Sequence, residues 1–207
     1  MFYYTILILI AFIMGIATGY FDWPFWILLT VLIFITALRF MYIFYILYKT
    51  QNHRLLYKFL KANRKNPIYG YAYSITTLDN DIIVAEIDRI LKKYKQPKMQ
   101  ALYKTSRALL KEDYELAKRE IASIEQDIIG QLSLAQIAAM ENNREEAKQY
   151  KLPEEWMRAF IEAIFALQDK DVAKFNEQRT IVLNGSKGLQ HFSNFYLLKK
   201  LKQHYLP

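Results

Sequence analysis

The chain has 207 residues, a net charge of +8 and no cysteine. The absence of cysteine excludes disulfide bonds, a thiolate nucleophile and cysteine-ligated zinc or iron–sulfur sites. Hydrophobic residues are concentrated in the first 48 positions, where Asp22 and Arg39 are the only charged residues. We therefore expect a membrane segment followed by one water-soluble domain.

Two apolar runs make up this N-terminal segment. Residues 2–18 are uncharged and about long enough to cross a hydrocarbon core of ~30 Å. The second run, from Phe25 to Tyr48, follows a short break, and Pro24 is well placed to start its helix. A cleaved signal peptide is the alternative for residues 1–19, but that stretch has no basic n-region and a second span follows at once. The pattern predicts a transmembrane helical hairpin over residues 1–48.

Small residues and one charge stand out inside the spans. Ala11, Gly15 and Gly19 form a small-xxx-small row, which lets helix backbones approach closely. We expect this row to pack against the second helix of the hairpin, with homo-oligomerisation as the alternative. Arg39 lies about two-thirds along the second run, where a long side chain reaches the cytoplasmic headgroups. A buried functional charge is the other interpretation of Arg39.

Residues 49–66 form a basic juxtamembrane segment with six cations and no acid. Its apolar residues recur at helical spacing, which predicts an amphipathic helix. Basic residues directly after a span favour a cytoplasmic C-terminus, and two spans then place the N-terminus inside as well. We expect a multi-pass protein of the cell membrane whose cations contact lipid headgroups. The expected headgroup contacts are Arg39, Arg54, Lys58, Lys61, Arg64 and Lys65.

Residues 67–207 are predicted to form a cytoplasmic helical domain, because no strand alternation occurs and apolar residues recur at helical spacing. One local pattern repeats: an apolar residue closes a helix, a polar turn follows, and a second helix carries a small inward-facing residue. The small residues are Ala85, Ala117, Ala147 and Ala173, spaced 32, 30 and 26 residues apart.

This pattern resembles the tetratricopeptide repeat, whose period is about 34 residues. The resemblance covers residues 67–180 and is clearest at Asp113, Tyr114 and Ala117. It implies an all-α fold in which antiparallel helix pairs stack into an α-solenoid with a partner-binding groove. By register, the groove residues are Tyr69, Tyr73, Leu102, Ser106 and Gln131.

The chain also departs from the repeat pattern. Lys104 and Thr105 stand where an apolar and a small residue are expected, and Leu152-Pro153 cuts the third unit short. An irregular helical bundle is the competing interpretation. A last helix over about residues 188–204 is predicted to cap the open end of the stack.

No catalytic pattern is found in the sequence. His53, His191 and His204 have no second ligand at i+3 or i+4, and neither HExxH nor GxSxG occurs. The turn at residues 184–188 fails the spacing of a phosphate-binding loop. We therefore expect neither an enzyme nor a metal or cofactor site. Nucleic acid is not expected as a partner either, because the cations gather beside the membrane and residues 67–152 have no net charge.

The expected function is a membrane-anchored scaffold or adaptor that presents its groove to an unidentified, membrane-associated protein. The alternative is an accessory subunit of a membrane transporter or cell-envelope complex that acts through the hairpin itself. The composition, rich in Lys, Ile and Tyr, is compatible with an AT-rich bacterial source.

Overall fold

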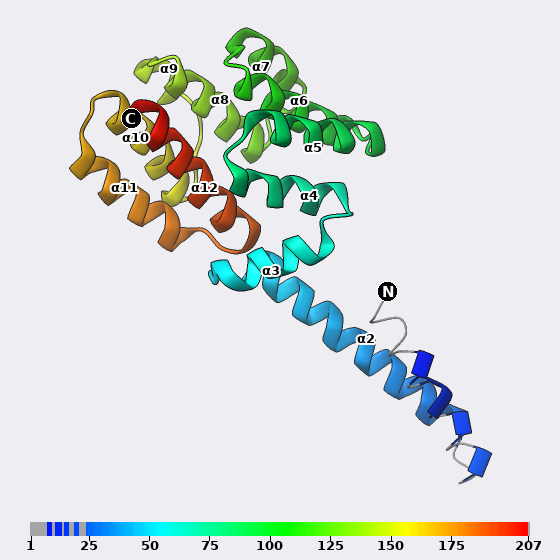
Figure 1. Ribbon diagram of the computed structural model, residues 1–207. Coiled ribbons are helices and arrows are strands. Elements are labelled where there is room, and N and C mark those ends of the chain that lie inside the picture. The colour runs from blue at the N-terminus through cyan, green and yellow to red at the C-terminus, as the bar shows by residue number, and fades with distance from the viewer. Residues whose placement is uncertain (1–7, 10, 14, 17–18, 21–23, 207) are drawn as a thin grey trace. The chain divides into compact units, whose positions relative to one another are not determined.

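The computed structural model describes residues 8–9, 11–13, 15–16, 19–20 and 24–206, and its regular elements within these ranges are all helices (Figure 1). The predicted all-α class is thus confirmed for the described part of the chain. The chain divides into two compact units, residues 1–46 and 47–207.

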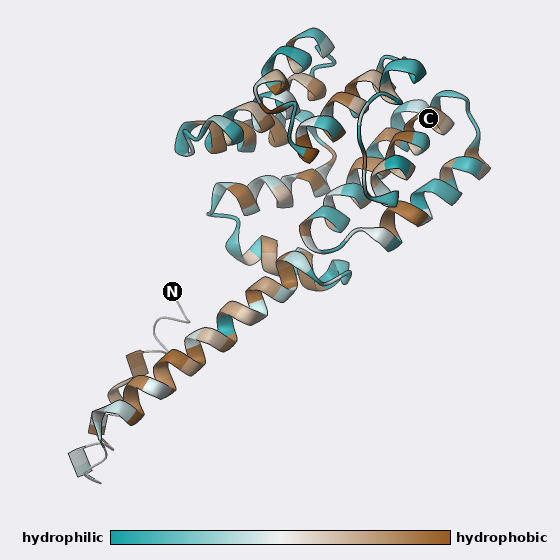
Figure 2. Cartoon of the chain, turned by 180° about the vertical axis from the view of Figure 1, so that it is seen from behind, coloured by the Kyte–Doolittle hydropathy of each residue, from teal (hydrophilic) through white to brown (hydrophobic). Residues whose placement is uncertain are grey.

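Helix α2, Phe25–Tyr48, dominates the first unit. Its surface is apolar almost throughout, as the brown ribbon in Figure 2 shows, and side chains such as Phe34 and Phe40 are exposed. By length and composition, the stretch Trp26–Tyr48 is able to span a membrane.

The few polar side chains of α2 suit an apolar surrounding. The hydroxyl of Thr30 donates to the carbonyl oxygen of Trp26 at 2.7 Å, and that of Thr36 donates to Leu32 at 2.8 Å. Each hydroxyl therefore has its hydrogen bond inside the helix and needs no partner from solvent.

The first predicted span, residues 2–18, lies largely outside the described residues. Those that are described within it, residues 8–9, 11–13 and 15–16, are helical. The helical hairpin therefore stays a prediction, whereas the second span corresponds to α2.

Helix α3, His53–Asn63, opens the second unit's helical domain. Asn52 caps it, because the Asn52 side-chain oxygen accepts a hydrogen bond from the N–H of Leu55 at 3.1 Å. Leu56 and Leu60 are buried one turn apart, while the basic side chains of α3 are exposed. This is the amphipathic helix expected within residues 49–66.

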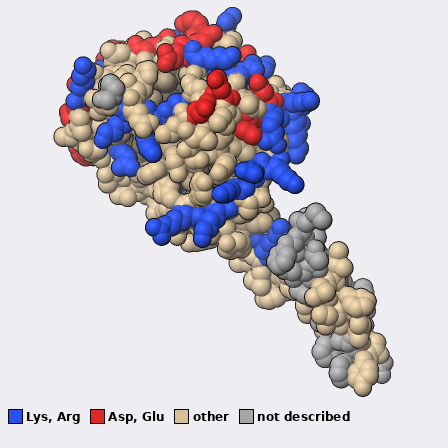
Figure 3. Space-filling view, viewed as in Figure 1, with Lys and Arg blue, Asp and Glu red and all other residues tan. Residues whose placement is uncertain are grey.

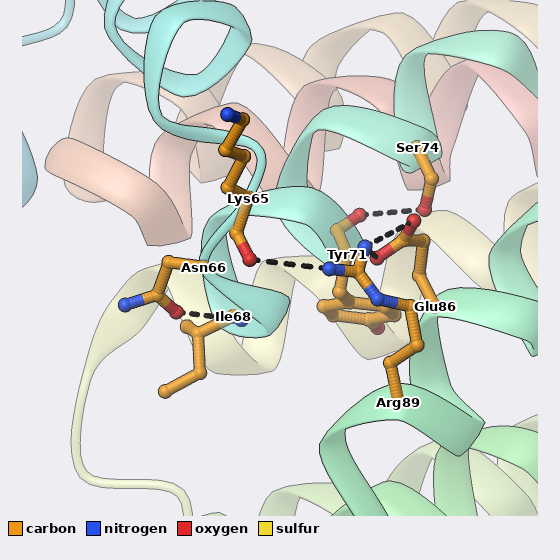
Figure 4. A network of polar contacts seen from close by, with 7 residues as sticks. All are labelled: Lys65, Asn66, Ile68, Tyr71, Ser74, Glu86 and Arg89. Atoms are coloured by element: carbon orange, nitrogen blue, oxygen red, sulfur yellow. Dashed lines mark hydrogen bonds and ion pairs between the residues drawn. The ribbon is translucent and has the colours of Figure 1, made fainter. Parts of the chain in front are cut away.

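The corner between α3 and the next helix is fixed by polar contacts (Figure 4). Arg89 pairs with Glu86 at 2.6 Å and donates a hydrogen bond to the carbonyl oxygen of Lys65 at 3.1 Å. Gly70 permits this approach, because a Cβ built there lies 2.5 Å from Glu86 Oε2 and 2.8 Å from the carbonyl oxygen of Arg64. Asn66 then caps α4, Pro67–Ser74, by accepting a hydrogen bond from the N–H of Ile68 at 3.0 Å.

Most of the remaining helices pack against the helix that follows them in the chain, and short turns join them in pairs (Figure 1). The first pair is α4 (Pro67–Ser74), continued by the 3₁₀ turn η1 (Ile75–Thr77), with α5 (Asn80–Lys93), and the second is α6 (Pro97–Leu110) with α7 (Tyr114–Ile121), followed by the 3₁₀ turn η2 (Ala122–Ile124). The third pair is α8 (Ile128–Met140) with the short α9 (Arg144–Ala147), and the fourth is α10 (Glu155–Gln168) with α11 (Val172–Gly185). The last helix is α12 (Gly188–Tyr205).

One turn geometry joins the two helices of every pair. Each turn contains a non-glycine residue in the left-handed region, with φ near +60°. These residues are Leu78, Glu112, Asn142 and Lys170. Each is followed by an Asp or Asn whose side chain caps the next helix: Asp79, Asp113, Asn143 and Asp171. In the last three turns the N–H of this capping residue also donates to a carbonyl five residues earlier, as in a Schellman motif.

The shared turns define which residue of each second helix faces inward. Four residues after each capping residue stand Ile83, Ala117, Ala147 and Phe175, and all four are buried. The predicted inward alanine is therefore confirmed at Ala117 and Ala147. It is wrong at Ala85 and Ala173, which are exposed: Ala85 lies two residues after the inward position of α5, and Ala173 lies two residues before the inward position of α11.

The largest apolar core surrounds α10. It contains Phe160, Ile164 and Phe165 from α10, alanines from α8, Phe175 and Val182 from α11, and Leu198 and Leu201 from α12. Smaller clusters lie between α5 and α6, around Ile87, and among α6, α7 and α8, around Ile121. The C-terminal half of the domain therefore holds most of its buried apolar surface.

Candidate functional site

A cavity of about 240 Å³ lies in the helical domain, between helices of the first three pairs and the C-terminal helix. Most of its lining is apolar, and α12 forms one complete wall. The lining residues are Tyr71, Ile75, Asn80, Ile83, Ser106, Leu109, Leu110, Glu112, Tyr114, Gln136, Met140, Ser193, Leu197, Lys200, Leu201, His204 and Tyr205.

Helix α12 is firmly seated as the wall of this cavity. Its residues Phe192 and Leu198 are fully buried, and Leu198 and Leu201 belong to the core around α10. The helix packs on α10 and α11 and also reaches α3 and η1. It therefore contacts helices from both ends of the domain and faces residues of α4, α6 and α8 across the cavity.

The start of α12 is clamped to the segment before α3. Gly188 adopts φ +58°, and its N–H donates to the carbonyl oxygen of Thr50 at 2.7 Å. The side-chain amide of Gln51 donates to the carbonyl oxygens of Leu183, Asn184 and Ser186 at 2.9–3.2 Å. Two ends of the domain that are more than 130 residues apart in sequence are thus held together.

Two histidines are packed into this clamp. The rings of His53 and His191 are 4.6 Å apart, and His53 also lies 4.3 Å from the ring of Phe195. His191 Nδ1 is 2.9 Å from the carbonyl oxygen of Leu183, whereas His53 Nδ1 is buried without a hydrogen-bond partner. Burial lowers the pKa of both imidazoles, and the charges of His191 and Arg179 lower the pKa of His53 further.

We expect this pair to make the stability of the domain fall in acid. The unfolded chain binds protons near the ordinary histidine pKa of 6.5, while the folded chain binds them only at lower pH. The free energy of unfolding is therefore unaffected by histidine protonation above pH 6.5, and it decreases as the pH falls from there through the lowered pKa values of the two histidines. Chemical denaturation of the full chain in detergent at about pH 7.5 and about pH 5.5 measures this loss.

Substituting the histidines separates their contribution to the loss of stability in acid from that of other groups. The double variant His53→Gln with His191→Gln is expected to show a smaller drop between the two pH values. His204→Gln, at an exposed position, serves as the matched control and should keep the drop. An unchanged drop in the double variant would assign the acid sensitivity to other groups.

Polar groups gather where α12 faces the turn between η1 and α5. Lys200 donates to the side-chain oxygen of Asn80, and the Asn80 amide donates to the carbonyl oxygen of Leu110 at 3.1 Å. Burial lowers the pKa of the Lys200 ammonium, while the charge of Asp79 opposes that shift. Glu112 also lines the cavity. Positive and negative groups balance here, so the cavity suits an apolar group better than an isolated anion.

Tyr71 of the opposite wall is backed by Tyr103, which does not line the cavity. The rings of Tyr71 and Tyr103 meet edge to face at 5.2 Å. Burial raises the pKa of both phenols, and a hydrogen bond with Ser106 partly opposes the shift at Tyr71. Both phenols stay protonated at neutral pH, so neither serves as a general base.

The structure places the five predicted groove residues in different surroundings. Ser106 lines the cavity. Tyr69 packs on Phe59, the hydroxyl of Tyr73 lies 3.3 Å from that of Tyr57, Leu102 packs on the cluster of Ile83 and Ile87, and Gln131 donates to Glu125 and accepts from the N–H of Lys151. Of these five described residues, one therefore belongs to the cavity.

The residues predicted to pack within the membrane or to contact lipid headgroups have different surroundings. Ala11, Gly15 and Gly19 are helical, and a Cβ built at Gly15 or Gly19 meets no heavy atom of the described chain within 4 Å. Arg39 is half-buried in α2. The juxtamembrane cations Arg54, Lys58, Lys61, Arg64 and Lys65 are all exposed.

The sequence did not predict that α12 forms one side of the cavity. Leu197, Lys200, Leu201 and Tyr205 form this wall. A signal for it existed, because Lys200 stands between Leu197 and Leu201 on an apolar stripe at helical spacing. The sequence did not tell whether that stripe faces the last helix pair or the inner faces of the earlier ones.

Comparisons with protein-family models, curated protein sequences and solved structures find no match for this chain. Within residues 8–9, 11–13, 15–16, 19–20 and 24–206, no group of three or more His, Cys, Asp or Glu side chains is placed to hold a metal ion.

Proposed function

We propose that the chain is a membrane-anchored interaction module, in which a tetratricopeptide-like α-solenoid binds a protein partner at the cytoplasmic face. The observation that carries this proposal is the recurrence of one turn geometry at Leu78, Glu112, Asn142 and Lys170. Repeated helix pairs of this kind build extended surfaces, and such surfaces serve protein binding.

The anchor in this proposal is a transmembrane hairpin formed by residues 1–48. The length and apolar surface of α2 support it, as does the basic stretch directly after Tyr48, which favours a cytoplasmic C-terminus. Two spans place the N-terminus on the same side. The small residues Ala11, Gly15 and Gly19 give the first span a face for close packing, within the hairpin or between copies of the chain.

The partner site is the cavity beside Ser106. Because α12 already forms one wall of the cavity, the domain accepts an apolar side chain of its partner in the cavity instead of a helix along the full groove. The apolar lining and the balanced charges of Lys200 and Glu112 support this choice. Anchoring raises the effective concentration of a membrane-associated partner, so modest intrinsic affinity suffices.

Crosslinking in the membrane followed by mass spectrometry tests the proposal. We expect the full chain and a version with an unrelated hairpin to capture the same protein. Ser106→Arg, which fills the cavity, should lose that protein, whereas Ser123→Arg at an exposed position should keep it. Circular dichroism of both variants checks that the helices are intact.

The same experiment decides between the two functions. If the captured protein is lost when the hairpin is exchanged, the chain acts as an accessory subunit of a membrane complex through its spans. In that case Ala11, Gly15, Gly19 and Arg39 are the positions to substitute. Capture that survives both the hairpin exchange and Ser106→Arg contradicts the cavity as the partner site.

A further inference from the structure

The exposed cations of α3 and of the turn after it have no acidic partner. Among the ion pairs of the described residues, none includes Arg54, Lys58, Lys61, Arg64 or Lys65. Helix α3 begins at His53, five residues after α2 ends at Tyr48. Because an extended residue covers at most about 3.6 Å, these cations stay close to the end of the apolar helix whatever the angle between them.

The C-terminal end of α5 adds cations to the same region. Arg89 reaches across to the carbonyl oxygen of Lys65, which places this end of α5 beside the end of α3. Lys92 and Lys93 follow Arg89 by three and four residues and therefore lie on the same side of the helix. Lys92, Lys93 and Lys95 are exposed, and the nearby acid Glu86 is already paired with Arg89.

The turn before α12 adds one more cation from a distant part of the sequence. Gln51 donates to the carbonyl oxygen of Ser186 at 2.9 Å, and the N–H of Gly188 donates to Thr50. Lys187, between these two contacts, is exposed beside the start of α3. Figure 3 shows Lys and Arg side chains gathered over α3 and over the end of α5, with few acidic side chains among them.

We propose that the exposed cations of residues 54–65, the segment Lys92–Lys95 and Lys187 form one basic surface that binds the headgroups of anionic phospholipids. This inference rests on the proposed membrane anchoring and adds the chemistry of the lipid. Each lysine or arginine near an anionic leaflet contributes favourably, and the effect is confined to about one Debye length. The basic surface holds the domain against the bilayer and so limits the positions from which its cavity meets a partner.

Phospholipid is favoured over nucleic acid by the position of the cations. Six cations, within residues 49–66, follow the apolar helix directly in sequence, and residues 67–152 as a whole have no net charge. A nucleic-acid surface draws its affinity from a basic patch that tracks a long phosphate backbone. RNA binding at these cations would therefore contradict the inference.

Energy transfer from the domain to lipid headgroups tests this inference on the full chain in nanodiscs. Because the chain has no cysteine, a single dye can be placed by Gln96→Cys, next to Lys95, or by Gln149→Cys as an exposed control position. The acceptor is a dye-bearing lipid headgroup. Bilayers contain phosphatidylcholine alone, or phosphatidylcholine mixed with phosphatidylglycerol.

We expect transfer from position 96 to rise when phosphatidylglycerol is present and to fall again at high salt, while position 149 shows no such rise. Lys92→Gln with Lys93→Gln and Lys95→Gln should weaken the docking equilibrium by about a hundredfold. Lys111→Gln with Lys148→Gln and Lys151→Gln, three exposed lysines of other turns, should leave it unchanged.

Three results would overturn the inference. The first is equal energy transfer in both bilayers, and the second is equal docking of the two triple variants. The third is that the chain in nanodiscs binds RNA, that the Lys92–Lys95 triple variant does not, and that this binding is independent of phosphatidylglycerol. Partner capture is scored in a separate crosslinking experiment, so failure of lipid docking is distinguishable from failure of the proposed function.

Discussion

Replacing Gly188 by valine is expected to destabilise the helical domain by about 3 kcal/mol or more. Gly188 holds φ +58°, which a β-branched residue resists, and a Cβ there would overlap the carbonyl oxygen of Leu47. The substitution also disturbs the hydrogen bond from Gly188 to Thr50, so the clamp between the start of α12 and the segment before α3 opens.

Chemical denaturation of the full chain in detergent measures this loss. Lys187→Val is the matched control, because Lys187 is the exposed neighbour of Gly188 in the same turn. We expect the control to stay within about 0.5 kcal/mol of the original chain. Equal stability of the two variants would show that the clamp contributes nothing to the fold.

Replacing Phe192 by alanine is expected to cost about 3–5 kcal/mol. Phe192 is fully buried in α12, and its ring lies 4.9 Å from that of Tyr196 and 5.9 Å from that of His53. Truncation removes apolar surface from the core and leaves a cavity between α12 and α3, which the helices fill only in part.

The half-buried Phe195 of the same helix provides the comparison for Phe192. Phe195→Ala removes an equal number of atoms from a more accessible position, so it should cost distinctly less. Both variants are measured by the same denaturation experiment. If Phe195→Ala proves the costlier of the two, α12 is seated differently from the packing described here.

The helical domain was predictable because its local signals agree. Asp or Asn before each second helix, prolines at the starts of α4 and α6, and apolar spacing all indicate helices. The inward register was harder to predict. Glu112 and Lys170 adopt left-handed φ values without being glycine, so their composition does not reveal where the turn lies. Matching alanines instead of capping residues therefore misplaced Ala85 and Ala173.

The cavity was much less predictable than the helices. Groove positions were assigned by register with a repeat, but the cavity depends on where α12 crosses the other helices. That position is fixed by contacts of high sequence separation, such as Gly188 with Thr50 and Lys200 with Asn80. No local pattern encodes such pairs, which explains why Ser106 was identified and Lys200 was not.

The chain's lack of cysteine allows the central claim, that α2 crosses the membrane and leaves the helical domain in the cytoplasm, to be tested directly. Single-cysteine variants Tyr20→Cys, before α2, and Lys148→Cys, in the helical domain, are treated with a membrane-impermeant maleimide in intact cells. We predict labelling of the first variant at once and of the second only after the membrane is permeabilised. Labelling of Lys148→Cys in intact cells would contradict the account, because the helical domain would then lie outside the cell.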